Sequence, residues 1–459
     1  MKGGDRFFCT ECGNETSKWM GRCPACGAWN ALAAAPATSG KTRRRGAARP
    51  VAEAVPITDA ASRPEPRIPV GPEGLDRVLG GGLVPGSLVL LSGEPGIGKS
   101  TLLLQMAASL GDGGRPVLVV SGEESPRQVA LRARRLGVRS DRVLLLPETS
   151  SEGVIERIGE LDPACVVVDS VQTMTSAEVD SAAGSVSQVR AAAARFQEIA
   201  KSRGTPVVLV GHVTKDGQVA GPKLLEHLVD VVLTLEGESG HELRLLRASK
   251  NRFGTVAELA LFSMTGAGLE PVRNPSAWLL EDRQAGAPGS AVAVTVEGTA
   301  PLLVEVQALT VPSQLASPRR VARGVEPGRL ALLLAVLERR LGLAFGERDV
   351  FVNVVGGLAP REPGMDLAVA AALVSAYMDR PLPDALALFG ELGLLGEVRG
   401  VGRAPERVRE AAALGFGRIA LPARDTDAVE TGVALLPQRH VGDLLALLED
   451  RPDGNRPVA

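Results

Sequence analysis

The sequence predicts an α/β protein built around a parallel-rich sheet, with a small cysteine module before it and a second α/β domain after it. Short apolar runs such as "SLVLLSG" and "ACVVVDS" end in small or polar residues and are separated by helical segments, a pattern typical of buried parallel strands. A glycine-rich stretch, "GEPGIGKST", follows the first of these runs. Four of the five cysteines lie within residues 9–26, which indicates a separate small module.

Length and composition limit the class of protein. A chain of 459 residues predicts two or three domains. The formal net charge is −2, so any contact with nucleic acid must come from a local basic surface. We find no apolar run long enough to span a bilayer and no signal-peptide pattern at the N-terminus. The sequence therefore predicts no membrane association and a cytoplasmic location.

The domain organisation follows from changes in composition along the chain. We expect a four-cysteine zinc finger over residues 1–30 and a flexible linker, rich in Ala, Pro and Arg, over 31–66. A first α/β domain is expected over 67–270 and a connector over 271–285. A second α/β domain is expected over 286–459, with strands such as "AVAVTVEG" and "DVFVNVVGG" and helices such as "RLALLLAVLERRLGL".

The cysteine module has the spacing Cys9-x2-Cys12-x10-Cys23-x2-Cys26. Two Cys-x2-Cys pairs can place four thiolates around one tetrahedral Zn²⁺ ion. Two disulfides or free thiols are the alternatives. Because Cys165 stands apart in an apolar run, the clustering favours a metal site in a reducing compartment.

The N-terminal region also carries a surplus of positive charge. Residues 1–50 hold nine basic and three acidic side chains. Such a surplus can attract phosphates, although a solvated linker beside a structural finger is an alternative interpretation.

The stretch "GEPGIGKST" matches the phosphate-binding P-loop pattern and lies between an apolar run and a helical segment, the context that the motif requires. Its glycines allow backbone N–H groups to face phosphates, Lys99 reaches the β and γ oxygens, and Ser100 ligates Mg²⁺. The sequence therefore predicts a site for ATP and Mg²⁺. The predicted nucleotide-binding residues are Gly93, Glu94, Pro95, Gly96, Ile97, Gly98, Lys99, Ser100, Thr101 and Asp169.

Three further strand ends supply polar residues for this site. Asp169 ends "CVVVD" and is expected to hold Mg²⁺ directly or through water. Glu123 is expected to be the general base, with Glu124 as the alternative, and a plain helix N-terminal acid remains possible at either position. His212 ends "VVLVGH" and is interpreted as a γ-phosphate sensor rather than a lone surface histidine.

The stretch "KNRFG" places two cations, Lys250 and Arg252, beside an amide, an aromatic ring and a glycine. It can be a solvated strand end, a nucleic-acid contact or a catalytic element. A complete P-loop site upstream supplies phosphates that these cations could contact.

Taken together, these parts resemble the bacterial RadA (Sms) DNA repair family of the RecA-like ATPase superfamily. The matching pieces are the four-cysteine finger, "GLDRVLGGGLVPGSLVLLSGEPGIGKSTLLLQ", "VSGEES", "GHVTKDGQVAGPKLLEH", "SKNRFGT" and "EGTAPLLVEVQALTVPS". The resemblance implies a RecA-like P-loop core in a hexameric ring ATPase that binds single-stranded and branched DNA and promotes branch migration beside a RecA-type recombinase. It also implies that Lys250 and Arg252 act on nucleotide or DNA held partly by a neighbouring subunit.

The C-terminal region resembles the proteolytic domain of Lon, which uses a Ser–Lys dyad. The counterpart of the serine stretch reads "REPGMDLAVA" and places Asp366 near the nucleophile position, whereas the counterpart of the lysine stretch reads "GVGRAPERVREAA". No lysine follows Lys250 in the chain, and arginine cannot act as the base that activates a serine. We therefore expect a proteolytically inactive scaffold, in which Arg319, Arg320 and Arg323 form either a DNA surface or a solvated face.

Three functions remain in competition on the sequence. The first is an ATP-driven DNA motor in recombination, and the second is a Lon-type ATP-dependent protease, which the missing lysine opposes. The third is a RecA-like ATP switch without motor activity, which the zinc finger and its basic linker oppose.

Overall fold

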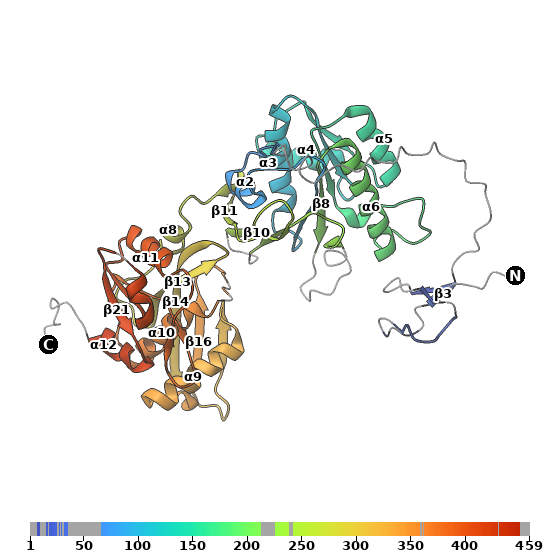
Figure 1. The fold of residues 1–459 in the computed structure, drawn as a ribbon. Helices are drawn as coiled ribbons and strands as arrows, with labels where there is room; N and C mark the ends of the chain where they lie inside the picture. The colour runs from blue at the N-terminus through green and yellow to red at the C-terminus, as the bar shows by residue number, and fades with distance from the viewer. Residues whose placement is uncertain are drawn as a thin grey trace, which may run out of the picture. The chain divides into compact units, whose positions relative to one another are not determined.

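The computed structural model describes residues 7–9, 15–16, 18–24, 27, 29, 32–34, 66–212, 225–237, 242–358, 360, 362–429 and 431–449 (Figure 1). The chain divides into two compact units. The described residues of 1–235, 248–255 and 266–268 belong to the first unit, and those of 236–247, 256–265 and 269–459 belong to the second. The domain limits at residues 270 and 285 stay a prediction. None of the described helices is long and apolar enough to cross a membrane.

The N-terminal module is a three-stranded antiparallel sheet in the order β2-β1-β3, formed by β1 (Phe7–Cys9), β2 (Glu15–Thr16) and β3 (Leu32–Ala34). Cys9 ends β1 and lies opposite Leu32. Cys23 is buried, and its carbonyl accepts the N–H of Gly27 at 2.9 Å. Gly27 has a φ of +76°, a left-handed conformation that glycine adopts without strain. This tight turn is the backbone geometry of a metal knuckle; Cys12 and Cys26 lie outside the described residues.

The first unit contains a parallel six-stranded arrangement in the order β9-β4-β8-β7-β5-β6. Its strands are β4 (Leu88–Gly93), β5 (Val117–Ser121), β6 (Val143–Leu146), β7 (Cys165–Asp169), β8 (Val207–His212) and β9 (Val231–Glu236). Its helices are α2 (Glu73–Leu79), α3 (Lys99–Asp112), α4 (Pro126–Arg135), α5 (Ser151–Leu161) and α6 (Val186–Arg203), with a 3-10 turn at Val171–Thr173. The predicted α/β class with a parallel-rich P-loop core is confirmed.

The strand sequences are apolar throughout because helices cover both faces of the sheet (Figure 1). Leu88 and Leu90 of β4 pack in one cluster with Phe196 of α6 and Val154 of α5. Side chains alternate along a strand, so the intervening residues face the side of the sheet on which α3 packs. Ser185 caps α6 by accepting the N–H of Gln188.

The second unit is built on a seven-stranded mixed sheet in the order β15-β16-β14-β13-β17-β20-β21. Its strands are β13 (Ser290–Glu297), β14 (Ala300–Pro312), β15 (Arg320–Arg323), β16 (Arg348–Val354), β17 (Leu386–Leu388), β20 (Arg418–Pro422) and β21 (Ala434–Gln438), and a hairpin pairs β18 (Glu391–Leu392) with β19 (Val398–Arg399). Its helices are α8 (Pro275–Leu279), α9 (Pro327–Leu341), α10 (Asp366–Met378), α11 (Ala404–Ala413) and α12 (Leu444–Glu449).

Three further strands lie between these regions along the chain: β10 (Leu243–Asn251), β11 (Leu259–Thr265) and β12 (Gly268–Pro271). β10 and β11 pair antiparallel from Leu243↔Ser263 to Arg247↔Leu259. The division between the two units passes through β10 after Arg247, so the "KNRFG" end of this strand belongs to the first unit.

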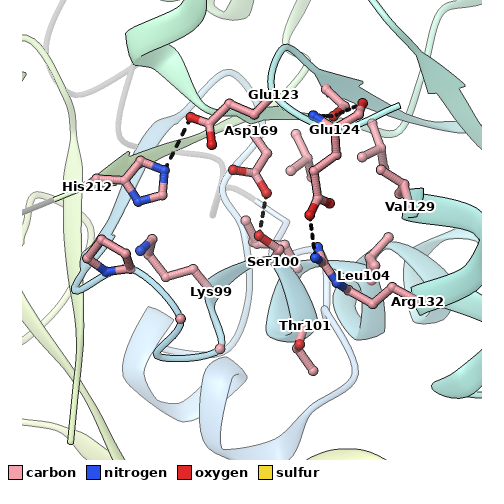
Figure 2. Close-up of a pocket in the computed structure, with 17 residues that line it drawn as sticks. Lys99, Ser100, Thr101, Leu104, Glu123, Glu124, Val129, Arg132, Asp169 and His212 are labelled. Carbon is pink, nitrogen blue, oxygen red and sulfur yellow. Dashed lines mark hydrogen bonds and ion pairs between the residues drawn. The ribbon is translucent and has the colours of Figure 1, made fainter. Parts of the chain in front are cut away.

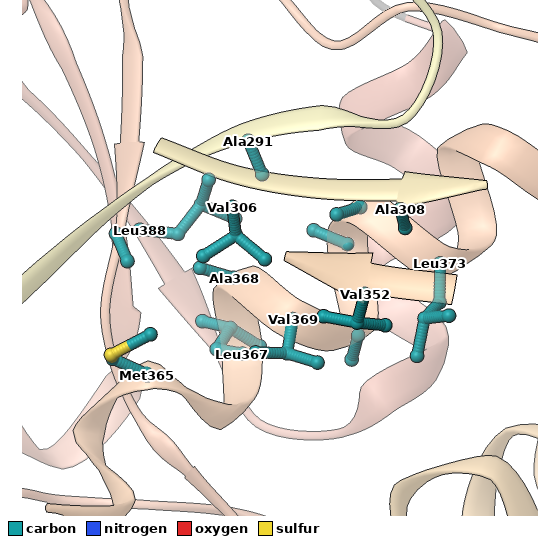
Figure 3. Packing of buried hydrophobic residues seen from close by; sticks show 14 of the residues in the cluster. Ala291, Val306, Ala308, Val352, Met365, Leu367, Ala368, Val369, Leu373 and Leu388 are labelled. Carbon is teal, nitrogen blue, oxygen red and sulfur yellow. The ribbon is translucent and has the colours of Figure 1, made fainter. Parts of the chain in front are cut away.

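Helix α10 forms the centre of the second unit's core. It is buried from Asp366 to Ser375 and packs against β13 and β14. Figure 3 shows Leu367, Val369 and Leu373 among the side chains that fill the space beneath the sheet. Because aromatic residues are scarce, the core buries its apolar surface through close packing of Ala, Val and Leu side chains.

We predict that Cys23→Ser lowers the bound metal to well under one ion per chain, because a hydroxyl is a poor substitute for a thiolate ligand of Zn²⁺. The measurement is elemental analysis of the purified protein. Cys165→Ala is the matched control, because Cys165 is fully buried in β7 and burial raises the pKa of its thiol to about 12, so it should not ligate a metal. Unchanged metal content in the Cys23 variant would rule out ligation there.

Candidate active site

The register of four parallel strands brings the predicted site residues to one edge of the sheet. Gly93 at the end of β4 lies opposite His212 at the end of β8. Ser121 at the end of β5 lies opposite Asp169 at the end of β7. Because carboxyl ends of parallel strands share one edge, ligand groups collect in the crevice there.

The P-loop connects the end of β4 to the start of α3. Gly98 caps the helix with a φ of +116°, which a residue with a β-carbon adopts only under strain. Lys99 is buried, and its ammonium donates to the carbonyls of Gly93 and Glu94 at 2.9 Å each. Burial lowers the pKa of Lys99, while the carboxylates of Asp169 and Glu123 act in the opposite direction. The cation is thus held at the helix N-terminus, where phosphate binding is favourable.

Asp169 and Ser100 form a pair of oxygen ligands. The hydroxyl of Ser100 donates to Oδ2 of Asp169 at 2.5 Å. Burial raises the pKa of Asp169, and the hydrogen bond from Ser100 opposes this. A hydroxyl and a buried carboxylate are the oxygen donors that Mg²⁺ takes beside phosphates, so these residues fit the predicted magnesium site.

The two adjacent glutamates of "GEES" point in different directions (Figure 2). Glu123 accepts a hydrogen bond from Ser170 and lies 3.4 Å from His212 Nε2. Glu124 instead pairs with Arg132 of α4, with 2.6 Å between Oε1 and Nη2. Glu123 therefore faces the P-loop and Asp169 side of the pocket, whereas the charge of Glu124 is balanced by an arginine.

His212 has unused hydrogen-bonding capacity inside the pocket. Within the part of the chain that the structure describes, neither of its ring nitrogens has a hydrogen-bond partner, although both atoms are buried. Its 3.4 Å approach to Glu123 is an ion-pair distance without hydrogen-bond geometry. An unpartnered buried donor beside a phosphate loop fits contact with a terminal phosphate.

These side chains line one pocket of about 330 Å³, within the size range of small-ligand sites. It includes residues of the P-loop, both glutamates, Asp169 and His212. Of the predicted nucleotide-binding residues, Gly93, Glu94 and Ile97 do not line this pocket, and the others do.

Lys250 and Arg252 do not line this pocket. Lys250 donates to the carbonyls of Glu226 and Val229, and Arg252 pairs with Asp230 at 3.1 Å. Asp230 N–H in turn donates to the carbonyl of Leu88, the first residue of β4. The P-loop begins at the other end of that strand, roughly 17 Å away at the usual rise per residue, so both cations lie at the opposite edge of the sheet from the chain's own nucleotide site.

Sequence reasoning missed three residues that the structure places in these contacts. Arg132 is one of several arginines on α4, and nothing in its spacing singles it out. Ser170 follows Asp169 but carries no motif. Asp230 precedes the apolar run "VVLTLE", and an acid at such a position is usually solvated, whereas here its side chain is only 5% exposed.

In the Lon-like region of the second unit, Asp366, which lies near the expected nucleophile position, forms an ion pair with Arg329. Asp366 begins α10, and its carboxylate binds the guanidinium of Arg329 and accepts the N–H of Leu392 at 3.1 Å. Burial raises the pKa of Asp366, which the bond from Arg329 opposes. In the lysine counterpart stretch, Arg403 donates to a backbone carbonyl and Arg407 is buried against Glu362. These side chains are engaged in structural contacts.

Comparison with known families matches three parts of the chain. Residues 55–218 match the family described as AAA domain, residues 7–34 match the rubredoxin metal binding domain, and residues 338–444 match the Lon protease (S16) C-terminal proteolytic domain. The N-terminal module is therefore a metal-binding ribbon, and the first unit contains a nucleotide-dependent ATPase domain. Among solved structures, a KaiC-like protein of Pyrococcus horikoshii aligns with 46% of this chain and all of its own length at 18% identity and a TM-score of 0.39.

Curated relatives match along nearly the whole chain, and each is described as DNA repair protein RadA. The Pseudomonas aeruginosa protein is 51% identical over 91% of this chain and 92% of its own. The Halalkalibacterium halodurans protein is 49% identical over 91% and 92%. The Escherichia coli protein is 47% identical over 97% and 98%. At these levels of identity and coverage, this chain belongs to the DNA repair protein RadA family.

Proposed function

We propose that this protein is a DNA-dependent ATPase that acts in recombinational repair, binding single-stranded and branched DNA and promoting branch migration. The relatives' name supports the repair role. The proposed mechanism rests on the distance between the P-loop pocket and the two cations, Lys250 and Arg252. Lys250 and Arg252 lie at the sheet edge away from their own P-loop, so a catalytic role for them needs a second subunit.

A ring in which ATP lies between subunits satisfies this requirement. Heterologous, head-to-tail contacts close into rings and place one face of each subunit against a different face of its neighbour. One subunit then supplies the P-loop, Asp169 and Glu123, and the next supplies Lys250 and Arg252. We propose a homo-hexamer on the family resemblance, with a RecA-type recombinase as a partner on the DNA.

Within the pocket, the proposed roles follow from the contacts. Lys99 neutralises the β and γ phosphate oxygens. Ser100 and Asp169 would hold Mg²⁺, which would supply positive charge beside those oxygens. Glu123 accepts a proton from the attacking water, a role supported by its position beside His212 in the pocket. His212 contacts the γ-phosphate. Residues 213–224, which follow it, lie outside the described residues.

The C-terminal domain is proposed to be a scaffold without protease activity. The carboxylate of Asp366 is engaged by Arg329 and the backbone of Leu392, and no lysine follows Lys250. A Ser–Lys dyad therefore cannot form within this domain.

The proposal predicts that single-stranded DNA raises the rate of ATP hydrolysis severalfold and that casein stays intact in the same reaction. Lys99→Ala should abolish hydrolysis, because the ammonium that binds the phosphates is lost. Phosphate release and gel analysis of casein are the two measurements. A protein that neither binds DNA nor changes its ATPase rate with DNA would contradict the motor, and cleaved casein would restore the protease hypothesis.

The two glutamates are predicted to differ in importance. Glu123→Gln should lower kcat by about 10²- to 10⁴-fold, the usual contribution of a positioned general base. Glu124→Gln, the matched control at the next position, should keep kcat within about tenfold of the wild type, because Glu124 is paired with Arg132 away from the reacting phosphate. Steady-state ATPase kinetics make the comparison. Equal losses in both variants would refute the assignment of Glu123 alone as the base.

We predict that Lys250→Ala assembles normally and binds ATP but loses about 10³-fold or more in kcat, as expected for a cation that acts in trans. Light scattering reports assembly and phosphate release reports kcat. Co-assembly with Lys99→Ala subunits should restore part of the activity, since each variant supplies what the other lacks. Normal branch migration by Lys250→Ala, or no recovery in the mixture, would exclude the trans role.

A further inference from the structure

A buried carboxylate lies at the sheet edge where β4 begins. Asp230 is 3% exposed, and its Oδ2 accepts the N–H of Leu88 at 3.1 Å. Its own N–H donates to the carbonyl of Leu88 at 2.8 Å. Asp230 is therefore fixed by two hydrogen bonds to the first residue of the strand that leads into the P-loop.

The same carboxylate binds the cationic segment. Asp230 Oδ1 lies 3.1 Å from Nη1 of Arg252, and the carbonyl of Asp230 accepts the N–H of Arg252 at 3.1 Å. The guanidinium of Arg252 is half exposed, so it is anchored on one side and open to solvent on the other. An arginine held in this way loses less conformational freedom when it binds a further anion.

Lys250 is oriented by the residues that precede Asp230. Its ammonium donates to the carbonyls of Glu226 and Val229, the latter at 2.7 Å. These contacts use two of its three donors. Downstream, Asn251 Oδ1 accepts the N–H of Phe253 at 2.9 Å, and Arg67 donates to the Phe253 carbonyl. The segment is thus tied to the body of the domain at several points.

Charge explains why an acid is needed at this position. Lys250 and Arg252 lie close enough to repel each other, and both burial and the charge of Arg252 lower the pKa of Lys250, whereas Asp230 acts in the opposite direction. Among the described groups that affect Lys250, Asp230 and Glu226 supply the negative charge. Asp230 is the one of these two that also binds Arg252 and the start of β4.

We propose that Asp230 is a positioning residue that holds Lys250 and Arg252 in the geometry with which they act on the ATP bound by a neighbouring subunit. The proposal rests on the trans role of these cations. Asp230 itself touches neither nucleotide nor reacting atoms, and it joins the cationic segment to the strand that carries the chain's own P-loop.

The test is Asp230→Asn, which keeps the size of the side chain and an oxygen for the N–H of Leu88 but removes the charge that binds Arg252. We expect kcat for ATP to fall about 10- to 100-fold, the effect of a modest misplacement of a catalytic group. The KM for ATP and the affinity for a fluorescent ATP analogue should change less than about twofold, because the variant's own pocket is intact.

Asp162→Asn is the matched control. It removes an Asp–Arg pair of the same length, 3.1 Å to Arg115, on the same unit and outside both sets of site residues. Asp162 has a φ of +44°, which asparagine tolerates well. This variant should keep wild-type kcat and KM. If Asp162→Asn lost as much kcat as Asp230→Asn, the loss in both would reflect general destabilisation, and the proposal would be overturned.

Co-assembly distinguishes positioning from a structural role. Subunits with Asp230→Asn have an intact P-loop but misplaced Lys250 and Arg252 side chains. Subunits with Lys99→Ala have a defective P-loop but correctly placed Lys250 and Arg252. In an equimolar mixture that assembles at random, about one interface in four joins the intact P-loop of one variant to the correctly placed cations of the other. The mixture should therefore hydrolyse ATP faster than either variant alone. Absence of recovery, or failure of Asp230→Asn to bind the ATP analogue, would show a structural requirement instead and refute positioning.

The outcome also separates this inference from the proposed function. Wild-type kcat in Asp230→Asn beside an inactive Lys250→Ala would refute the role of Asp230 and leave the trans mechanism standing. Full activity in both variants would remove the trans mechanism itself.

Discussion

The parallel register of β4 with β8, and of β5 with β7, is the constraint on which the rest of the first unit depends. It places Gly93 opposite His212 and Ser121 opposite Asp169. A slip of one residue along any of these strands would turn its side chains to the other face, and the P-loop, Asp169 and His212 would no longer meet. The near-continuous Val and Leu content of these strands matches the burial of both faces of the sheet.

The same rigid strands separate two charged clusters by the length of β4. At one end, Lys99, Asp169, Glu123 and His212 surround a pocket of about 330 Å³. At the other end, Asp230 holds Arg252 beside Lys250. A strand buried in the centre of a sheet transmits displacement with little loss, since packed interiors are dense and poorly compressible. The arrangement suits a subunit that hydrolyses its own ATP with help from one neighbour and gives that help to another.

Two ion pairs connect helices of the second unit to their surroundings. This unit matches the Lon proteolytic family over residues 338–444, and the ion pairs involve residues of the two stretches that resemble the serine and lysine stretches of that family. Asp366 with Arg329, and Glu362 with Arg407, are partly or fully buried. Removing one partner of such a pair leaves an uncompensated charge, at a cost of about 3–5 kcal/mol. Asp366 therefore connects α10 to α9, and Glu362 and Arg407 connect α11 to β13.

Much of this protein could be predicted from its sequence, because the P-loop and the apolar strands are local patterns set by backbone and burial requirements. The α/β class, the strands that end at Gly93, Asp169 and His212, and the metal-binding ribbon follow from residue spacing alone. The direction of the two glutamates does not, because Glu123 and Glu124 are chemically identical and only Arg132 and Ser170, brought close by folding, distinguish them. The positions of Lys250 and Arg252 cannot be predicted from the sequence either. They depend on Asp230 and Leu88, which are distant from both cations in sequence, and the pairing of distant residues is decided by tertiary packing.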